Sequence, residues 1–247
     1  MPPASLPSAP RSAARWAASL VSTAVGLSGA ALVRLVDADA ALRIIHGTCA
    51  LAHRLFELDV RLRDDNPGGY RRGSYVFVIL NQTSLLETFL LPWLAPVPYR
   101  IIVNIEYALM PIFGWSSVPL GARVVVRQWP AQAKRAIRRA IADLRRGDSY
   151  IISIEGRRSP DGALQPYKKG AVVMAIEAEA TIVPVILRGA RERLPFGAWR
   201  VQPGPVEVHL LPAIDTRGLT YEDRDMLVAR LRALASMNLA DAPNDTV

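Results

Sequence analysis

Cysteine and histidine are both scarce in this sequence. Cys49 is the only cysteine among 247 residues, and histidine occurs three times, at His46, His53 and His209. A single thiol excludes an intrachain disulfide and a metal site built from several cysteines, and we predict no metal centre. The first two histidines fall in an expected helical region, and His209 falls on the exposed side of an expected late strand. We therefore predict surface or packing roles for all three rather than catalysis.

Acidic residues are outnumbered by basic ones. The chain has 22 Asp and Glu against 30 Lys and Arg, a net charge of +8, and 51% hydrophobic residues. Its isoelectric point is about 10.1 and its mean hydropathy is +0.17, which is more apolar than most soluble domains. A basic and apolar chain suits an anionic membrane surface or anionic substrates. Basic stretches interleaved with aromatic residues are lacking, so we expect no nucleic-acid partner.

The first quarter of the chain is predicted to be helical. Residues 1–11 are rich in Pro, Ser and Ala and are expected to be disordered. Residues 16–33 carry no charge, but their many small residues weaken membrane insertion. A second helical stretch follows at 38–58 without a break, which disfavours a cleaved signal peptide. We predict a membrane-associating helical hairpin over residues 12–63, on the cytoplasmic face of the cell membrane. Two helices packed on a core are the alternative.

Strands and helices alternate after a strong turn signal at 66–69, Asn-Pro-Gly-Gly. This alternation predicts one α/β domain over residues 64–237, followed by a polar tail at 238–247. A short helix after the first strand is expected to stop at Pro92. The expected strands are 75–80, 99–103, 124–126, 150–154, 181–186 and 206–210, and the main expected helices are 130–146, 171–179 and 220–235.

The turn after the strand 75–80 carries the first candidate site. Asn81, Gln82 and Thr83 follow the strand directly, and a helix is expected to begin within four residues. Ser84 and Glu87 have the spacing of a capping box, in which each side chain bonds the other residue's backbone amide. Strand-to-helix turns are where α/β proteins place ligand-binding and catalytic groups. We therefore take this turn as the candidate active site.

Three further motifs follow in order along the chain. They are Pro111, Phe113, Gly114 and Trp115 with Arg127 after a strand; Glu155, Gly156, Arg157, Arg158 and Ser159; and Lys168, Lys169, Gly170 and Ala171 before a helix and the strand Val183-Pro184-Val185. Each motif places charged or glycine residues at the end of a strand or the start of a helix. An arginine at a strand end can hold a phosphate by a bidentate, charge-assisted pair.

Together the four motifs resemble the lysophospholipid and glycerolipid acyltransferase family, typified by 1-acylglycerol-3-phosphate acyltransferase. They cover residues 75–190 in the family's order. The resemblance implies a single α/β domain with a central mixed β-sheet flanked by helices. It also implies transfer of an acyl group from acyl-CoA or acyl-carrier protein to a lysophospholipid-type acceptor. Membrane lipids and the thioester donor are then the expected partners, and no cofactor is needed beyond the donor.

The resemblance also assigns roles to residues. The family's Asn-His-x-Ser-x-x-Asp motif, with His as general base, aligns with the turn at 81–87. The implied catalytic positions are Gln82, Ser84 and Glu87, and the implied substrate-binding residues are Asn81, Arg127, Glu155, Gly156, Arg157, Arg158, Lys168 and Lys169. Among these, Arg158 and Glu155 are expected to bind the glycerol phosphate end of the acceptor.

Two substitutions separate this turn from the family pattern. Gln82 occupies the position of the family's His, and Glu87 that of its Asp. A glutamine amide cannot accept a proton at any working pH, whereas a positioned histidine contributes about 10²- to 10⁴-fold as a general base. Two hypotheses follow. The chain is either an acyltransferase that uses another base such as Glu87, or a lipid-binding or regulatory relative without catalysis. A third reading is an acceptor so acidic or reactive that no strong base is required. For Glu87 itself, holding the start of the helix is the structural alternative to catalysis.

Overall fold

A mixed β-sheet forms the centre of the fold. The computed structural model describes residues 6–70, 73–109, 114, 117–118, 120–126 and 128–240. These contain seven strands in the order β1-β7-β6-β2-β5-β3-β4, and all neighbours run parallel except β6 and β7. The strands are β1 Leu58–Asp64, β2 Tyr75–Ile79, β3 Tyr99–Asn104, β4 Arg123–Val125, β5 Ser149–Ser153, β6 Thr181–Arg188 and β7 Gly204–Leu210. The predicted α/β fold with a central mixed sheet is confirmed.

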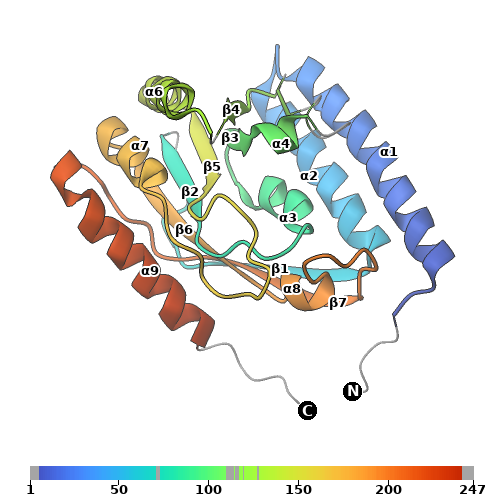
Figure 1. Ribbon diagram of the computed structural model, residues 1–247. Helices are drawn as coiled ribbons and strands as arrows, with labels where there is room; N and C mark the ends of the chain where they lie inside the picture. Colours follow the sequence, from blue (N-terminus) through green and yellow to red (C-terminus); the bar gives the residue numbers. More distant parts are fainter. Residues whose placement is uncertain are drawn as a thin grey trace.

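Helices cover both faces of the sheet (Figure 1). The first three helices, α1, α2 and α3, lie on one side, and α6, α7 and α9 lie on the other. The helices are α1 Ala9–Val33, α2 Ala38–Leu55, α3 Glu87–Leu94, α4 Ile105–Ala108, α6 Pro130–Arg145, α7 Gly170–Ala178, α8 Ala190–Arg193 and α9 Arg224–Ala240, with a 3₁₀ turn η1 at Tyr221–Asp223.

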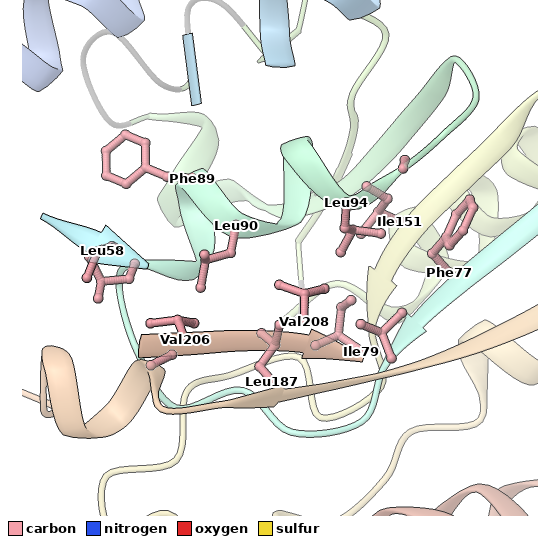
Figure 2. Close-up of a cluster of buried hydrophobic side chains, with 14 of the residues drawn as sticks. Leu58, Phe77, Ile79, Phe89, Leu90, Leu94, Ile151, Leu187, Val206 and Val208 are labelled. Carbon is pink, nitrogen blue, oxygen red and sulfur yellow. The ribbon is translucent and has the colours of Figure 1, made fainter. Parts of the chain in front are cut away.

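Strand β2 is buried on both faces, which explains why its sequence is a continuous apolar run. Phe77 and Ile79 face the cluster under α2 and α3, where Leu90 packs over the sheet (Figure 2). Val76 and Val78 face the cluster formed with α6, α7 and α9. Packing on both faces holds β2 in place, and so positions the turn that follows it.

Pro184 lies inside β6, where a proline ordinarily removes a hydrogen bond from the sheet. Its carbonyl accepts from the Leu211 amide at 2.9 Å, so its backbone faces the β7 side. Regular pairing with β7 begins only at Val185, and the missing N–H therefore falls beyond the end of that ladder. The proline is accommodated without loss of a β6–β7 ladder bond.

The predicted helical hairpin is present as α1 and α2, which pack side by side (Figure 1). Small residues allow this close approach, since a Cβ added to Gly26 would lie 2.0 Å from Thr48 Oγ1. The second helix, α2, joins the main core through Ala52. In contrast, α1 leaves Val21 and Val25 63% and 69% exposed. By length and composition, α1 is also the one described helix that could cross a membrane.

Helices extend into both terminal segments. Because α1 begins at Ala9, the disorder predicted for residues 1–11 is wrong from that residue onward. Similarly, α9 continues through Ala240, so the predicted polar tail at 238–247 begins too early. The end of α9 is fixed to the sheet, since the Arg188 guanidinium donates to the Asn238 carbonyl at 2.6 Å. Residues 1–5 and 241–247 lie outside the described residues.

Two further expectations are corrected. Residues 58–64 form β1 and pair in parallel with β7, so the hairpin predicted to reach residue 63 ends earlier. The alternating apolar residues of this segment were a strand signal. The third helix, α3, also continues through Pro92, which was expected to end it. In so short a helix the proline removes only the bond to the Thr88 carbonyl.

Candidate active site

Two strand-end turns meet at the carboxyl edge of β2 and β5. The strands are adjacent and parallel, so their carboxyl ends lie together. The Gln82 amide donates to Glu155 Oε2 at 2.8 Å, and the Gln165 amide donates to Glu155 Oε1 at 2.7 Å. The Ser159 amide donates to the Gln82 carbonyl at 2.6 Å. The structure thus joins the motif around Gln82 to the motif around Glu155.

Two residues expected to bind substrate hold the turns together instead. Glu155 is 2% exposed, and both of its oxygens accept backbone amides. Its burial raises the pKa of this carboxyl above the ordinary value. Asn81 is 4% exposed, donates to the Leu187 carbonyl at 2.7 Å and accepts from the Leu187 amide at 2.9 Å. The structure gives Glu155 and Asn81 structural roles in place of the expected substrate contacts.

Half of the expected capping box is present. The Thr83 and Ser84 amides donate to Glu87 Oε1 at 2.6 and 2.8 Å. The Ser84 hydroxyl, however, accepts from the Leu86 amide at 3.2 Å rather than from the Glu87 amide. It also donates to the Leu194 carbonyl at 2.9 Å. Since its proton is committed to that carbonyl, Ser84 supports the turn rather than acting as a nucleophile.

Glu87 has one bonded and one unbonded oxygen. The side chain is 2% exposed, and this burial raises the pKa of the carboxyl to about 8. Among the described residues, Glu87 Oε2 has no hydrogen-bond partner. A carboxyl with a pKa close to neutral can take up and return a proton during a reaction. Gln82 is half-buried and lines the same cavity as Glu87.

A cavity of about 520 Å³ adjoins these groups. Its wall is mainly apolar and is built from the ends of β3 and β5 together with α3 and α6. Its polar lining residues are Gln82, Ser84, Glu87, Thr88, Asn104, Lys134, Ser153, Arg158 and Lys168. An apolar cavity with a few convergent polar groups is the usual form of a ligand site.

Two of the predicted cations line this cavity. Arg158 is half-buried, and its guanidinium carbon lies 5.1 Å from the centre of the Phe196 ring. Lys168 Nζ would lie 3.1 Å from a Cβ placed on Gly156, whose φ of +67° also favours glycine. Gly156 therefore lets the lysine and the turn approach each other closely. Both cations thus add positive charge to the lining of the cavity.

Other predicted cations lie elsewhere. Arg157 is exposed and donates to Gln165 Oε1 at 3.0 Å. Lys169 forms an exposed ion pair with Asp225 at 2.6 Å. Neither side chain lines the cavity. Arg127 lies outside the described residues, as does most of the motif at 111–115.

Histidine does not line the cavity. His46 Nε2 lies 3.1 Å from the carbonyl of Ala95, just after α3, and His53 Nε2 lies 3.2 Å from the carbonyl of Phe89 in α3, which fits the predicted packing roles. His209 was expected to be exposed, and this is wrong. It is 2% exposed and its Nε2 lies 2.6 Å from Asp65 Oδ2. The described part of the chain contains no group of three or more His, Cys, Asp or Glu side chains that could hold a metal ion.

Comparison with known proteins identifies the family. The chain matches the family model described as Acyltransferase over residues 61–188, just over half of its length. The chain belongs to this acyltransferase family. The matched segment runs from β1 to β6, and so contains both strand-end turns and most of the cavity wall.

Relatives in plants share the central part of this acyltransferase-family chain. A 1-acyl-sn-glycerol-3-phosphate acyltransferase of Limnanthes alba is 32% identical over 65% of this chain and 58% of its own length. The enzyme of that name from Cocos nucifera is 31% identical over 68% and 55%. The chain thus spans a little over half the length of these relatives. The crystal structure of the Thermotoga maritima enzyme PlsC has a TM-score of 0.68 and 22% identity, covering 93% of this chain and 100% of that one, which shows a shared fold.

Three residues of this acyltransferase-family site were missed by sequence reasoning. Asn104 ends β3, Lys134 lies on α6, and both line the cavity. Phe196 contacts Arg158 from a loop far along the chain. Asn104 follows an expected strand directly, so its position at the carboxyl edge could have been found. Phe196 and Lys134 carry no local signal, because only the tertiary fold brings them to the site.

Proposed function

We propose that this chain transfers an acyl group from a thioester donor to the hydroxyl of a lysophospholipid-type acceptor. The donor is acyl-CoA or an acyl-carrier protein. The observation that carries the proposal is the apolar cavity, which is lined by Glu87 and by the cations Arg158 and Lys168. An apolar wall suits an acyl chain, and the cations suit a phosphate.

In the proposed reaction the acceptor hydroxyl oxygen attacks the thioester carbonyl carbon. Glu87 removes the hydroxyl proton through Oε2, directly or through one water. The tetrahedral intermediate then collapses, the C–S bond breaks, and the thiolate leaves with the proton that Glu87 returns. Glu87 Oε1 remains bonded to the Thr83 and Ser84 amides, which hold the carboxyl in place during both proton transfers.

The second candidate function is lipid binding without catalysis. It is favoured by Gln82, which cannot take the proton, and by the pKa of Glu87 of about 8, which leaves most of this carboxyl protonated at pH 7. The two functions are separated by assaying the full chain with an acyl-CoA and lysophosphatidic acid from pH 6 to 9. Turnover that increases with pH supports acyl transfer. Saturable lysolipid binding with no turnover at any of these pH values supports the alternative.

Arg158 tests the phosphate assignment. Arg158→Ala is expected to weaken binding of an anionic lysolipid by about 10- to 100-fold at low salt, since hydrogen bonds between charged groups are worth about 1.5–3 kcal/mol. The difference from wild type should shrink as salt is raised. Arg157→Ala is the matched control, because its exposed side chain lies off the cavity, and it should change binding less than about twofold. Equal losses in both variants contradict the assignment.

We also propose that the chain works at a membrane, on its cytoplasmic face. Support comes from the uncovered apolar face of α1, where Val21 and Val25 are exposed. Replacing both with Glu should reduce binding to anionic vesicles by about tenfold or more, because each valine contributes about 1.5 kcal/mol or more when buried. Met226→Glu on α9 is a control, since it adds charge at another exposed apolar residue. Unchanged vesicle flotation of the α1 variant would exclude this contact.

A further inference from the structure

The cavity extends into an opening between β3 and β5. The two strands pair over Tyr99–Ile101 and Ser149–Ile151, and the later residues of β3 pair with β4 on its other side. Beyond this ladder, residues of both strands line the cavity. They are Ile102, Val103 and Asn104 on one side, and Ile152 and Ser153 on the other, followed by Ile154 just after β5. The separation of the strands therefore makes room for a ligand beside the end of β3.

Asn104 stands in this opening with an unpaired amide. The residue is 8% exposed, and neither Oδ1 nor Nδ2 has a hydrogen-bond partner among the described residues. Asn81 offers a direct contrast, because it is 4% exposed and both of its amide atoms bond the Leu187 backbone. Buried polar groups are nearly always paired in folded proteins. An unpaired amide in an apolar wall therefore points to a group that arrives with a ligand.

We propose that Asn104 binds a neutral polar group of the substrate, one that both donates and accepts a hydrogen bond. Such a group pairs with Oδ1 and Nδ2 together, whereas an anion leaves Oδ1 without a donor. A hydroxyl and a secondary amide both have this chemistry. This inference rests on the proposed function, in which the acceptor supplies a hydroxyl and the pantetheine arm of the donor supplies an amide.

The first test is the stability of the ligand-free protein. Asn104→Leu should raise Tm by about 2–4 °C, because it removes an unpaired buried amide and leaves no partner behind. Asn81→Leu is the matched control. It should lower Tm by at least a similar amount, since it leaves the Leu187 amide and carbonyl without their hydrogen-bond partner. A decrease in Tm in both variants would overturn the claim that the Asn104 amide is unpaired. This outcome does not depend on whether the protein catalyses acyl transfer.

The second test locates the partner by measured binding. One pair of probes is the decanoyl thioester of N-acetylcysteamine and that of ethanethiol, which lacks the amide. The other pair is lysophosphatidic acid and its 2-deoxy analogue, which lacks the hydroxyl. In wild type, loss of the group that Asn104 binds should weaken binding about tenfold, and in Asn104→Leu the same loss should have no effect. If wild type alone discriminates within the first pair, Asn104 binds the donor amide. If wild type alone discriminates within the second pair, Asn104 binds the acceptor hydroxyl. If both proteins discriminate equally within both pairs, the inference is wrong.

Discussion

Replacing Glu87 with glutamine is expected to reduce acyl transfer by about 10²- to 10⁴-fold, the usual contribution of a general base. Glutamine keeps the oxygen that accepts the Thr83 and Ser84 amides, so the turn should stay in place. It cannot take a proton, and this is the property under test. Gln82→Ala is the matched control in the same cavity wall, and because Gln82 is not the base its loss should be much smaller. Equal activity of Glu87→Gln and wild type would contradict the role of Glu87.

The pH dependence gives the same prediction a second readout. Burial raises the pKa of Glu87 to about 8, and only the carboxylate form can remove a proton. The wild-type rate should therefore increase as pH rises, reach half of its maximum near pH 8 and level off about one unit higher. Residual activity of Glu87→Gln should lack this dependence. The same sigmoidal profile in both proteins would assign the titration to another group.

Stability should show the opposite trend with pH. A carboxyl whose pKa is raised by folding favours the folded state when protonated, so its contribution is complete below its unfolded pKa of about 4.5. That contribution is lost as pH rises toward 8, by an amount on the order of 4 kcal/mol. Glu87→Gln removes this loss, so the variant should gain stability over wild type at pH 9 and gain little at pH 5. Urea denaturation at the two pH values measures the difference.

The strand-end turns and their motifs could be predicted from the sequence, because their signals are local. A buried apolar run followed by polar and capping residues located the turn at Gln82, and Gly156 marked the second tight turn. The direction of each side chain could not be predicted. Asn81 is adjacent to Gln82 in sequence, yet its amide bonds the Leu187 backbone instead of facing the cavity. Which side a turn residue faces depends on the neighbouring strand, and pairing across the sheet is a non-local property.

Errors at the ends of elements have a similar origin. Residues 59–63 follow the helix expected at 38–58 and were grouped with the helical hairpin, although their alternating apolar residues are a strand signal and they pair with β7 from the far end of the chain. His209 was expected on an exposed face, but its ring is buried and lies against the side chains of Asp65 and Arg188. An alternating pattern distinguishes the two faces of a strand without saying what packs on either face. The contact of Phe196 with Arg158 likewise depends on tertiary structure alone.

Glu155→Ala is expected to destabilise the fold by about 3–5 kcal/mol. The variant removes a buried carboxylate that accepts two backbone amides, those of Gln82 and Gln165. Hydrogen bonds to a charged group are worth about 1.5–3 kcal/mol each, and removing the acceptor leaves both donors unpaired. Since the Gln82 amide belongs to the active-site turn, acyl transfer should fall together with stability. Urea denaturation measures the first effect, and turnover at a temperature where the variant is folded measures the second.

The comparison of Glu155 with Arg157 decides between the two roles considered for this motif. Arg157 is exposed and its side chain bonds Gln165, so Arg157→Ala should change stability by less than about 0.5 kcal/mol. If Glu155 contacted substrate instead, Glu155→Ala would keep its stability and lose only acceptor binding. The geometry supports the first result, because both carboxylate oxygens are already bonded at 2.8 and 2.7 Å and the side chain lies off the cavity. A carboxylate in this position joins the β2 turn, which leads to Glu87, to the β5 turn, which leads to Arg158, so the relative placement of these two lining residues depends on it.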